Sequence, residues 1–386
     1  MNILHLTQTD INSDSRILKE MNSIAISNDI YNVSGIGVIL NRGEKYTANS
    51  DKLDIHSIIL NSREWRFLPR IIRHTCSLAE LTFKMFLKAK RLEPKVIHCN
   101  DTLVLPLGVV VKMFTGAKLI YDAHELESDR NGLTKTLGKL TLLVEKILWR
   151  YVDALIVVSP SIEKWYMENI GEKCSEVILN APVIEKTGVF TNNQYLREHF
   201  SIAKNSKIFL YVGGLVYGRG IDLLVEAFKK SDTESSLVFL GYGSLSVELK
   251  NTAEKYSNIY VHDAVSHEQV VPIAKSADVG LCLIQNVSLS DYYCLPNKLF
   301  EYCFAEIPVL ASNFPDISET VEKYNLGKCT ELDSDNIYKA IKEFEDMDEL
   351  PRINAQDLYE LSWGAQEEKL IKLYGRLINP SDKKNS

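Results

Sequence analysis

The hydrophobic pattern changes period repeatedly along the chain, with short apolar runs alternating with longer stretches of helical periodicity. In the first half, strands are predicted at 2–6, 31–40, 54–60, 95–99, 117–121 and 154–158, and helices at 15–27, 78–91 and 134–151. In the second half, strands are predicted at 207–212, 236–240, 258–261, 278–283 and 308–311, and helices at 221–230, 244–256, 267–275 and 297–305. Strands that alternate with helices predict a parallel sheet covered on both faces, here twice.

The length of 386 residues also favours two domains. The polar segment 184–206 is a candidate linker. We therefore predict an α/β protein of two doubly wound, Rossmann-like domains that face each other across a cleft, where such sheets bind ligands. The predicted domains are residues 1–183, joined by a C-terminal helix within 364–386 that crosses back, and residues 184–363.

Composition places the chain among globular cytoplasmic proteins. Hydrophobic residues make up 45% and charged residues 25%. The seven cysteines are odd in number and lack metal-finger spacing, so reduced structural thiols are expected. The first residues resemble a strand rather than a signal peptide, and no apolar run approaches the roughly 20 residues that span a bilayer.

Charge differs between the two halves. Residues 1–180 contain 23 Lys and Arg against 21 Asp and Glu, whereas the remainder contains 21 against 30.

Residues 61–91 interleave basic with aromatic and aliphatic side chains, a pattern that suits the inner face of an anionic cell membrane. Arg66, Arg70 and Arg73 are the candidate contacts. An ordinary helical pair with a solvated basic face is the open alternative. Nucleic acid is disfavoured because the rest of the chain is acidic.

A helix start at residues 296–301 is a candidate anion site. Pro296 is favoured at a first helical position, and free N–H groups there suit a phosphate. Lys298 adds a cation, Asn297 lies beside it, and Glu301 could accept hydrogen bonds from hydroxyls. Phosphate and hydroxyls together are what a sugar nucleotide offers. A solvated helix start with incidental charges is the alternative.

A glycine-rich loop lies between a predicted strand and helix at 213–220. Its four glycines include Gly213 and Gly214 and permit close backbone approach to a diphosphate, while Arg219 adds charge. The loop matches neither the dinucleotide fingerprint nor the Walker motif, and the first strand also lacks a glycine fingerprint, which disfavours a dehydrogenase.

Polar residues also end predicted strands in the first half. His124 follows the strand at 117–121, where a parallel sheet delivers side chains to its ligand, and could contact a sugar hydroxyl or a phosphate. A loop histidine that caps the next segment is the alternative. Asp14, Ser15 and Arg16 begin the first predicted helix, where Asp14 or Ser15 could serve only as the helix cap.

These segments together resemble the retaining glycosyltransferases of family 4, which have the GT-B fold. The similarity rests on the segments 14–20, 97–101, 121–125, 212–222, 295–302 and 361–363, in that order, and covers nearly the whole chain. The resemblance implies an acceptor-binding first domain, a donor-binding second domain and a final helix that packs on the first. It identifies Glu301 as the ribose ligand, Arg219 and Lys298 as diphosphate-binding cations, and His124 as a contact of the transferred sugar.

The implied reaction moves a sugar from a UDP- or GDP-linked donor to a glycan or polyprenyl-linked acceptor, without metal or other cofactor. A bacterial-type surface polysaccharide is the expected product, with Arg16, Arg66, Arg70 and Arg73 towards the acceptor or membrane. Two positions depart from the family: Cys294 stands where the first Glu of its E-x7-E pattern belongs, and Gly214 where Arg is frequent. A degenerate fold-mate that binds another transferase, or a sugar-nucleotide epimerase, remains an alternative.

Overall fold

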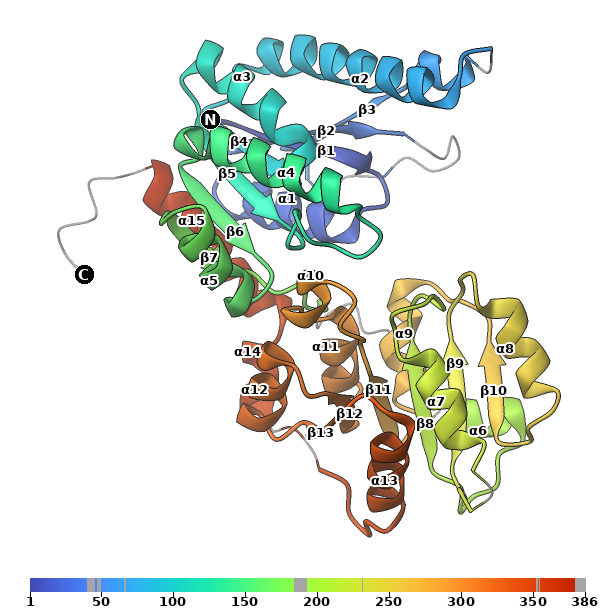
Figure 1. Ribbon diagram of the computed structural model, residues 1–386. Helices are drawn as coiled ribbons and strands as arrows, with labels where there is room; N and C mark the ends of the chain where they lie inside the picture. Colours follow the sequence, from blue (N-terminus) through green and yellow to red (C-terminus); the bar gives the residue numbers. More distant parts are fainter. Residues whose placement is uncertain are drawn as a thin grey trace. The chain divides into compact units, whose positions relative to one another are not determined.

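A computed structural model places the chain in two compact units. It describes residues 1–39, 46, 50–65, 67–183, 193–230, 232–351, 353 and 355–378. Unit 1 comprises Met1–Ile178 with Glu367–Ser386, and unit 2 comprises Leu179–Gln366 (Figure 1). Each unit is an α/β sandwich around one parallel sheet.

Unit 1 is built on a seven-stranded parallel sheet in the order β3-β2-β1-β4-β5-β6-β7. Its strands are β1 (Asn2–Asp10), β2 (Asn32–Val38), β3 (Leu53–Ile58), β4 (Val96–Asn100), β5 (Lys118–Ala123), β6 (Ala154–Val157) and β7 (Cys174–Val177). The strand order reverses between β1 and β4, which creates a switch point where ligands bind in sheets of this class.

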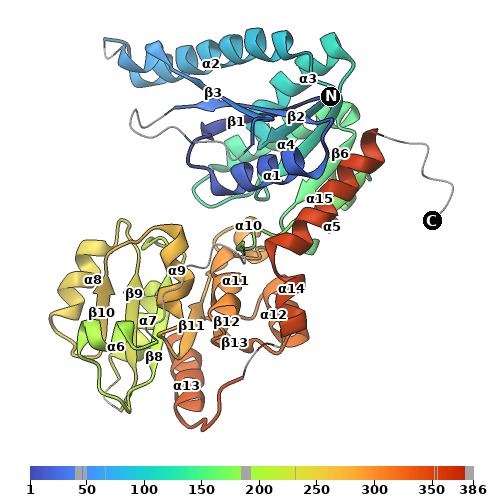
Figure 2. The ribbon, with the colours of Figure 1, turned by 180° about the vertical axis from the view of Figure 1, so that it is seen from behind.

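Helices cover both faces of the unit 1 sheet. They are α1 (Ser15–Ser27), α2 (Arg70–Leu92), α3 (Leu105–Thr115), α4 (Lys135–Leu148), α5 (Pro160–Asn169) and the second part of α15 (Trp363–Ile378), with short 3-10 turns η1 (Asn61–Glu64), η2 (Thr102–Val104) and η3 (Trp149–Tyr151). Helices α2, α3 and α4 lie side by side on one face (Figure 1), and α1 and α15 lie on the other (Figure 2). The Asp14 side chain caps α1, as one reading of the sequence predicted.

Unit 2 repeats the scheme with a six-stranded parallel sheet in the order β10-β9-β8-β11-β12-β13. The strands are β8 (Ile208–Val212), β9 (Ser236–Leu240), β10 (Ile259–His262), β11 (Val279–Cys282), β12 (Val309–Ser312) and β13 (Gly327–Thr330). The helices are α6 (Tyr195–Phe200), α7 (Ile221–Phe228), α8 (Ser246–Ala253), α9 (His267–Ala274), α10 (Leu289–Tyr292), α11 (Asn297–Phe304), α12 (Pro315–Lys323), α13 (Ser334–Glu345) and α14 (Ala355–Glu360). The switch point lies between β8 and β11.

The alternating pattern predicted from the sequence is confirmed in both halves, with differences at the edges. The two edge strands β7 and β13 were not predicted, because they are only partly buried and carry few apolar residues to mark them. Part of the predicted linker is the helix α6, whose Leu196 is fully buried, and residues 184–192 lie outside the described residues. Pro296 is the N-cap of α11 rather than its first helical residue.

Tyr302 fixes α11 against the sheet of unit 2. Its fully buried hydroxyl accepts a hydrogen bond from the N–H of Val212 at 2.9 Å and donates towards the carbonyl of Leu210 at 2.9 Å. The ring lies against Gly280 so closely that a Cβ there would meet it at 2.3 Å. Since Val212 directly precedes the glycine-rich loop, this contact sets the position of the loop relative to the start of α11.

We expect Tyr302→Phe to lower the free energy of unfolding by about 1–3 kcal/mol, because the N–H of Val212 would lose its buried acceptor. Chemical denaturation measures the change. Tyr324→Phe, at a more exposed tyrosine on the same unit, is the matched control and should differ little from wild type. Equal stability of the two variants would contradict this role of Tyr302.

Candidate functional site

In unit 1, His124 is held by a buried carboxylate. Asp122, on β5, is fully buried, and its Oδ2 lies 3.2 Å from Nε2 of His124, in the turn after the strand. Nδ1 of His124 lies 3.6 Å from Oδ1 of Asp101, which follows β4. Burial alone would lower the pKa of His124, but the charge and hydrogen bond of Asp122 outweigh it and raise the pKa to about 9. His124 is therefore an imidazolium at neutral pH, able to donate to a hydroxyl or phosphate oxygen.

Arg16 is the counter-ion that allows Asp122 to be buried. Its Nη2 donates to Oδ1 of Asp122 at 3.2 Å, and its Nη1 donates to the carbonyl of Ile178 at 3.0 Å. Burial would raise the pKa of Asp122, but Arg16 and His124 hold it well below its ordinary value. Only 4% of Arg16 is exposed, so the membrane part of its predicted acceptor or membrane role is wrong, whereas contact with an acceptor stays a prediction. Arg16 is buried because the carboxylate of Asp122 needs a cation beside it in the low-dielectric interior of the protein.

A second layer of buried titratable groups supports Asp122. Nε2 of His98, on β4, lies 3.3 Å from Oδ2 of Asp122, and its Nδ1 lies 2.8 Å from the hydroxyl of Tyr374 on α15. Glu20, on α1, lies 3.1 Å from Nε of Arg16. Burial and then the charge of Asp122 raise the pKa of Glu20 to about 7, against the opposing effect of Arg16. The end of β5 is thus tied to α1, β4 and α15.

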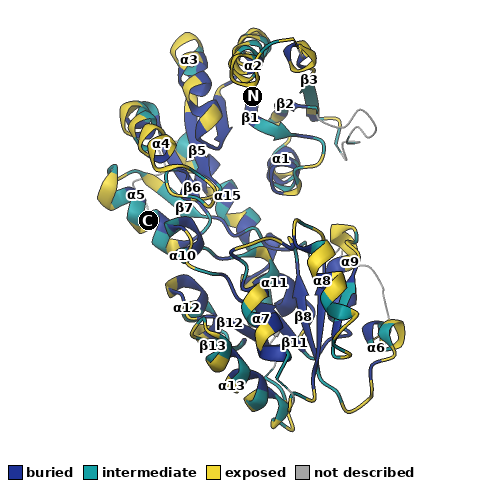
Figure 3. Ribbon diagram, turned by 45° about the vertical axis from the view of Figure 1, so that its right-hand side comes forward, coloured by how far each residue is buried: buried dark blue, intermediate teal, exposed yellow. Residues whose placement is uncertain are grey.

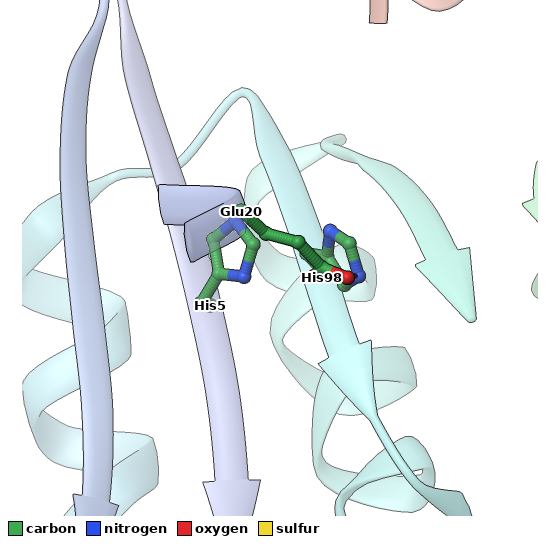
Figure 4. Close-up of side chains that lie close together, drawn as sticks. All are labelled: His5, Glu20 and His98. Carbon is green, nitrogen blue, oxygen red and sulfur yellow. Dashed lines mark ion pairs between the residues drawn. The ribbon is translucent and has the colours of Figure 1, made fainter. Parts of the chain in front are cut away.

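His5, Glu20 and His98 bring potential metal-ligating atoms within 4.8 Å of one another (Figure 4). The two imidazole rings stack at 4.2 Å between centroids with an interplanar angle of 25°. Lone pairs in nearly parallel ring planes do not converge on one point, whereas a bound metal needs convergent ligands. Arg16 beside Glu20 supplies the positive charge already. The cluster therefore fits a hydrogen-bonded support for Asp122 better than a metal centre.

In unit 2, Lys298 lies against the glycine-rich loop. Its Nζ is 3.7 Å from the centre of the Tyr211 ring, and a Cβ on Gly213 would lie 3.9 Å from the same Nζ. Gly213 has φ of 120°, a conformation that favours glycine, and directly follows β8. The ammonium therefore lies beside exposed backbone at the switch point of the sheet, where an anionic group is favoured.

Arg219 is an ion-paired side chain. Its Nη1 lies 3.0 Å from Oδ1 of Asp291, which is buried on α10 and bonded to Ser288. The pair fixes the guanidinium beside the loop while leaving 32% of its side chain exposed. Gly220, at the end of the loop, has φ of 69°, and a Cβ there would meet the carbonyl oxygen of Leu283 at 2.5 Å. Both contacts hold the loop in one conformation.

Glu301 and Asn297 lie on α11 with Lys298. Asn297 begins the helix, and Glu301, one turn later, is buried with its Oε1 at 3.5 Å from Nδ1 of His267. Cys294 lies before the helix, half-buried, and burial raises the pKa of its thiol. A neutral thiol cannot supply the carboxylate that the family pattern places there.

The remaining predicted residues lie elsewhere or are not described. Gly214 accepts a hydrogen bond from the Tyr211 hydroxyl through its carbonyl at 2.9 Å, so it belongs to the same loop as Gly213. Arg70 and Arg73 are on the first turn of α2 in unit 1, and Arg66 lies outside the described residues.

Sequence reasoning did not identify Asp122, Glu20, Tyr374 and Asp291 as partners of the predicted residues. Asp122 lies two positions before His124, at the end of a predicted strand, and this spacing could have identified it as a partner of the histidine. The others come from distant elements, and nothing in the sequence pairs them with the site.

Asp122→Asn should lower the pKa of His124 from about 9 towards its ordinary value of 6.5, because the main favourable charge facing the imidazole is lost and only Asp101 opposes Arg16. In wild type, the raised pKa stabilises the fold fully below pH 6.5, and this contribution disappears as the pH rises to 9. Histidine NMR titration measures the shift, with His199 in unit 2 as the internal control. A pKa that stays near 9 in the variant would contradict the assignment.

Comparisons with known proteins agree with this geometry. Residues 192–357 match the family described as Glycosyl transferases group 1. The chitobiosyldiphosphodolichol beta-mannosyltransferase of Candida albicans is 24% identical over 257 residues, which are 60% of this chain and 56% of that protein. An uncharacterized glycosyltransferase of Methanocaldococcus jannaschii is 23% identical over 198 residues, 47% of this chain and 48% of that protein. The chain thus spans about half the length of these curated relatives.

Solved structures share the fold over nearly the whole chain. Sucrose-phosphate synthase from Thermosynechococcus elongatus has a TM-score of 0.77 at 15% identity, covering 99% of this chain and all of that one. The Anabaena protein HepE in complex with UDP-glucose has a TM-score of 0.68 at 13% identity, with the same coverage. Residues 192–357 therefore match a group 1 glycosyltransferase domain, and the chain has the GT-B fold of these solved structures.

Proposed function

We propose that the protein transfers a sugar, with retention of configuration, from a UDP- or GDP-linked donor to a glycan or polyprenyl-linked acceptor in cell-surface polysaccharide synthesis. Unit 2 (Leu179–Gln366) binds the donor, and unit 1 binds the acceptor. The observation that carries the proposal is Lys298, whose ammonium lies beside the backbone of Gly213 at the switch point. A diphosphate there would contact the ammonium and the free N–H groups at the start of α11.

Catalysis by this site would be largely electrostatic. Negative charge grows on the leaving diphosphate, and prepositioned cations stabilise it without reorganising during the reaction. Lys298 and Arg219 of unit 2 supply that charge, and Asn297 and Glu301 bind the nucleotide sugar's polar groups. Within unit 1, protonated His124 is the candidate donor to a hydroxyl or phosphate oxygen. Each of these roles belongs to a side chain of the protein itself.

The donor and acceptor classes are supported by the relatives. HepE, of the same fold, is described in complex with UDP-glucose, which favours a uridine nucleotide here. The Candida relative is named for an acceptor in which a sugar is linked to dolichol through a diphosphate. A lipid-linked acceptor of that kind suits a cytoplasmic enzyme at the inner face of the membrane.

One observation favours a second candidate, a degenerate fold-mate that binds another transferase. Cys294 offers a neutral thiol in place of the expected carboxylate. A panel of UDP, GDP and TDP sugars separates the two, because an enzyme would release nucleoside diphosphate when acceptor is present, and a pure binding partner would release none. An epimerase would convert the sugar without any acceptor.

Lys298→Ala should lower kcat/KM by about 10²–10³-fold, because one cation facing the leaving group is removed. Release of nucleoside diphosphate from the donor identified in the panel measures the rate. Lys275→Ala, at a partly exposed lysine of unit 2 paired with Glu306, is the matched control and should retain activity. Equal activity of both variants would contradict a catalytic role for Lys298.

The outer helical layer of unit 1 supports peripheral contact with an anionic membrane. Helices α2, α3 and α4 carry ten Lys and Arg against two Asp and Glu, and Glu145 is buried while Glu80 is paired with Lys84. Large apolar side chains are exposed on all three helices, including Phe83, Phe114 and Ile147. Figure 3 shows exposed residues, in yellow, on each of these helices. Among the described residues, no helix is both long and apolar enough to cross a bilayer.

Reversing Arg70 and Arg91 to Glu, near the two ends of α2, should weaken binding to phosphatidylglycerol vesicles at least about tenfold, since each basic residue near such a surface contributes about 1 kcal/mol. Cosedimentation measures binding. Reversing Lys275 and Lys328, in unit 2, provides the control with the same change in net charge. Unchanged vesicle binding of the α2 variant would show that α2 is an ordinary solvated surface.

A further inference from the structure

A cavity within unit 1 lies outside the residues assigned so far. Its volume is about 720 Å³, within the range of small-ligand sites, and it is formed between η1, the first half of α2 and the end of β1. Three basic side chains line it: Arg63 from η1, and Arg73 and His74 from α2. No acidic side chain is among its lining residues.

The two arginines of the cavity are uncompensated. Within the described part of the chain, neither the exposed side chain of Arg63 nor the half-buried side chain of Arg73 makes a hydrogen bond or an ion pair with another residue. Arg16 and Arg219, by contrast, are each paired with a carboxylate. Guanidinium groups bind phosphate oxygens through two parallel N–H bonds, so two free ones around a single cavity favour a phosphate-bearing ligand.

The cavity wall also has an apolar part. Leu60, Leu78, Leu81 and Leu103 line it together with the basic residues and the polar Gln8 and Ser77. In the adjoining sequence, Phe67 and Ile71 expose about four-fifths of their surface to solvent. A ligand that satisfies both the basic and the apolar part of the wall has a phosphate head and a hydrocarbon chain.

A hydrogen bond and an ion pair connect the cavity with His124. Gln8, at the end of β1, lines the cavity, and its Nε2 donates to Oδ2 of Asp101 at 3.5 Å. Oδ1 of Asp101 lies 3.6 Å from Nδ1 of His124. Asp101 has φ of 70° and ψ of 160°, a conformation that residues other than glycine seldom adopt and that occurs most at functional sites. The cavity therefore adjoins the candidate catalytic histidine within one unit.

We propose that this cavity binds the phosphate group and the adjoining hydrocarbon of a lipid-linked acceptor, with Arg63 and Arg73 on the phosphate and the leucines on the chain. The sugar end of such an acceptor would then extend past Gln8 and Asp101 towards His124. This inference rests on the proposed transferase function and specifies its acceptor class.

The test is calorimetric titration of the full-length protein with farnesyl diphosphate and with inorganic diphosphate, with saturating UDP and GDP present so that the diphosphate site proposed in unit 2 is occupied. Farnesyl diphosphate should bind more tightly than inorganic diphosphate, because only the lipid also covers the leucines. The double variant Arg63→Gln and Arg73→Gln should bind farnesyl diphosphate at least about a hundredfold more weakly, because two charged hydrogen-bond donors to the phosphate are lost. Arg150→Gln, at an exposed arginine of η3 that does not line the cavity, should bind like wild type.

A second double variant, Leu78→Ser and Leu103→Ser, tests the contribution of the leucines separately from that of the arginines. It should weaken binding of farnesyl diphosphate and leave inorganic diphosphate unchanged. The inference is overturned if the lipid does not bind, if the arginine variant binds it as wild type does, or if inorganic diphosphate binds equally well. Binding of UDP and of GDP, measured by thermal shift on the same samples, reports on unit 2 separately. A protein that binds either nucleotide but not the lipid refutes this inference alone, whereas binding of neither nucleotide refutes the proposed function.

Discussion

The buried carboxylate of Asp122 constrains unit 1 more than any other group. Isolating such a charge from water costs several kcal/mol unless cations and donors surround it. Arg16 from α1, His98 from β4 and His124 after β5 meet that need together. These three side chains come from different elements, so the charge of Asp122 determines how α1, β4 and the end of β5 meet at the switch point. The need of Asp122 for a neighbouring cation also keeps His124 protonated.

Unit 2 positions its cation by a different device. The hydroxyl of Tyr302 is bonded to the backbone of β8, and its ring fills the space that Gly280 leaves. This contact places the start of α11 against the end of β8, so Lys298 reaches Gly213 without needing a carboxylate partner. A lysine held by packing keeps its charge available for a ligand, whereas Arg219, paired with Asp291, is partly neutralised.

Whether a cation is paired with a carboxylate distinguishes the cations that stabilise the fold from those that are available to bind a ligand. Arg16 is buried and fully engaged, and it serves the fold. Arg63 and Arg73 line a cavity and lack partners among the described residues, which is the state expected of groups that await an anion. Exposed apolar side chains lie near them on the same helical layer. Acceptor phosphate, acceptor lipid and membrane would then be recognised by one continuous part of unit 1.

The sequence by itself determined the two parallel sheets and the places where their strands deliver side chains, because apolar periodicity and glycine positions are local properties. It therefore located His124, the loop at 213–220 and the start of α11. It could not mark β7 and β13, whose edge positions leave them half-exposed. It also assigned Arg16 to the acceptor or the membrane, because a charged residue on a helix is usually solvated. Only tertiary structure decided that Arg16 is buried against Asp122, since the pairing joins residues 106 positions apart.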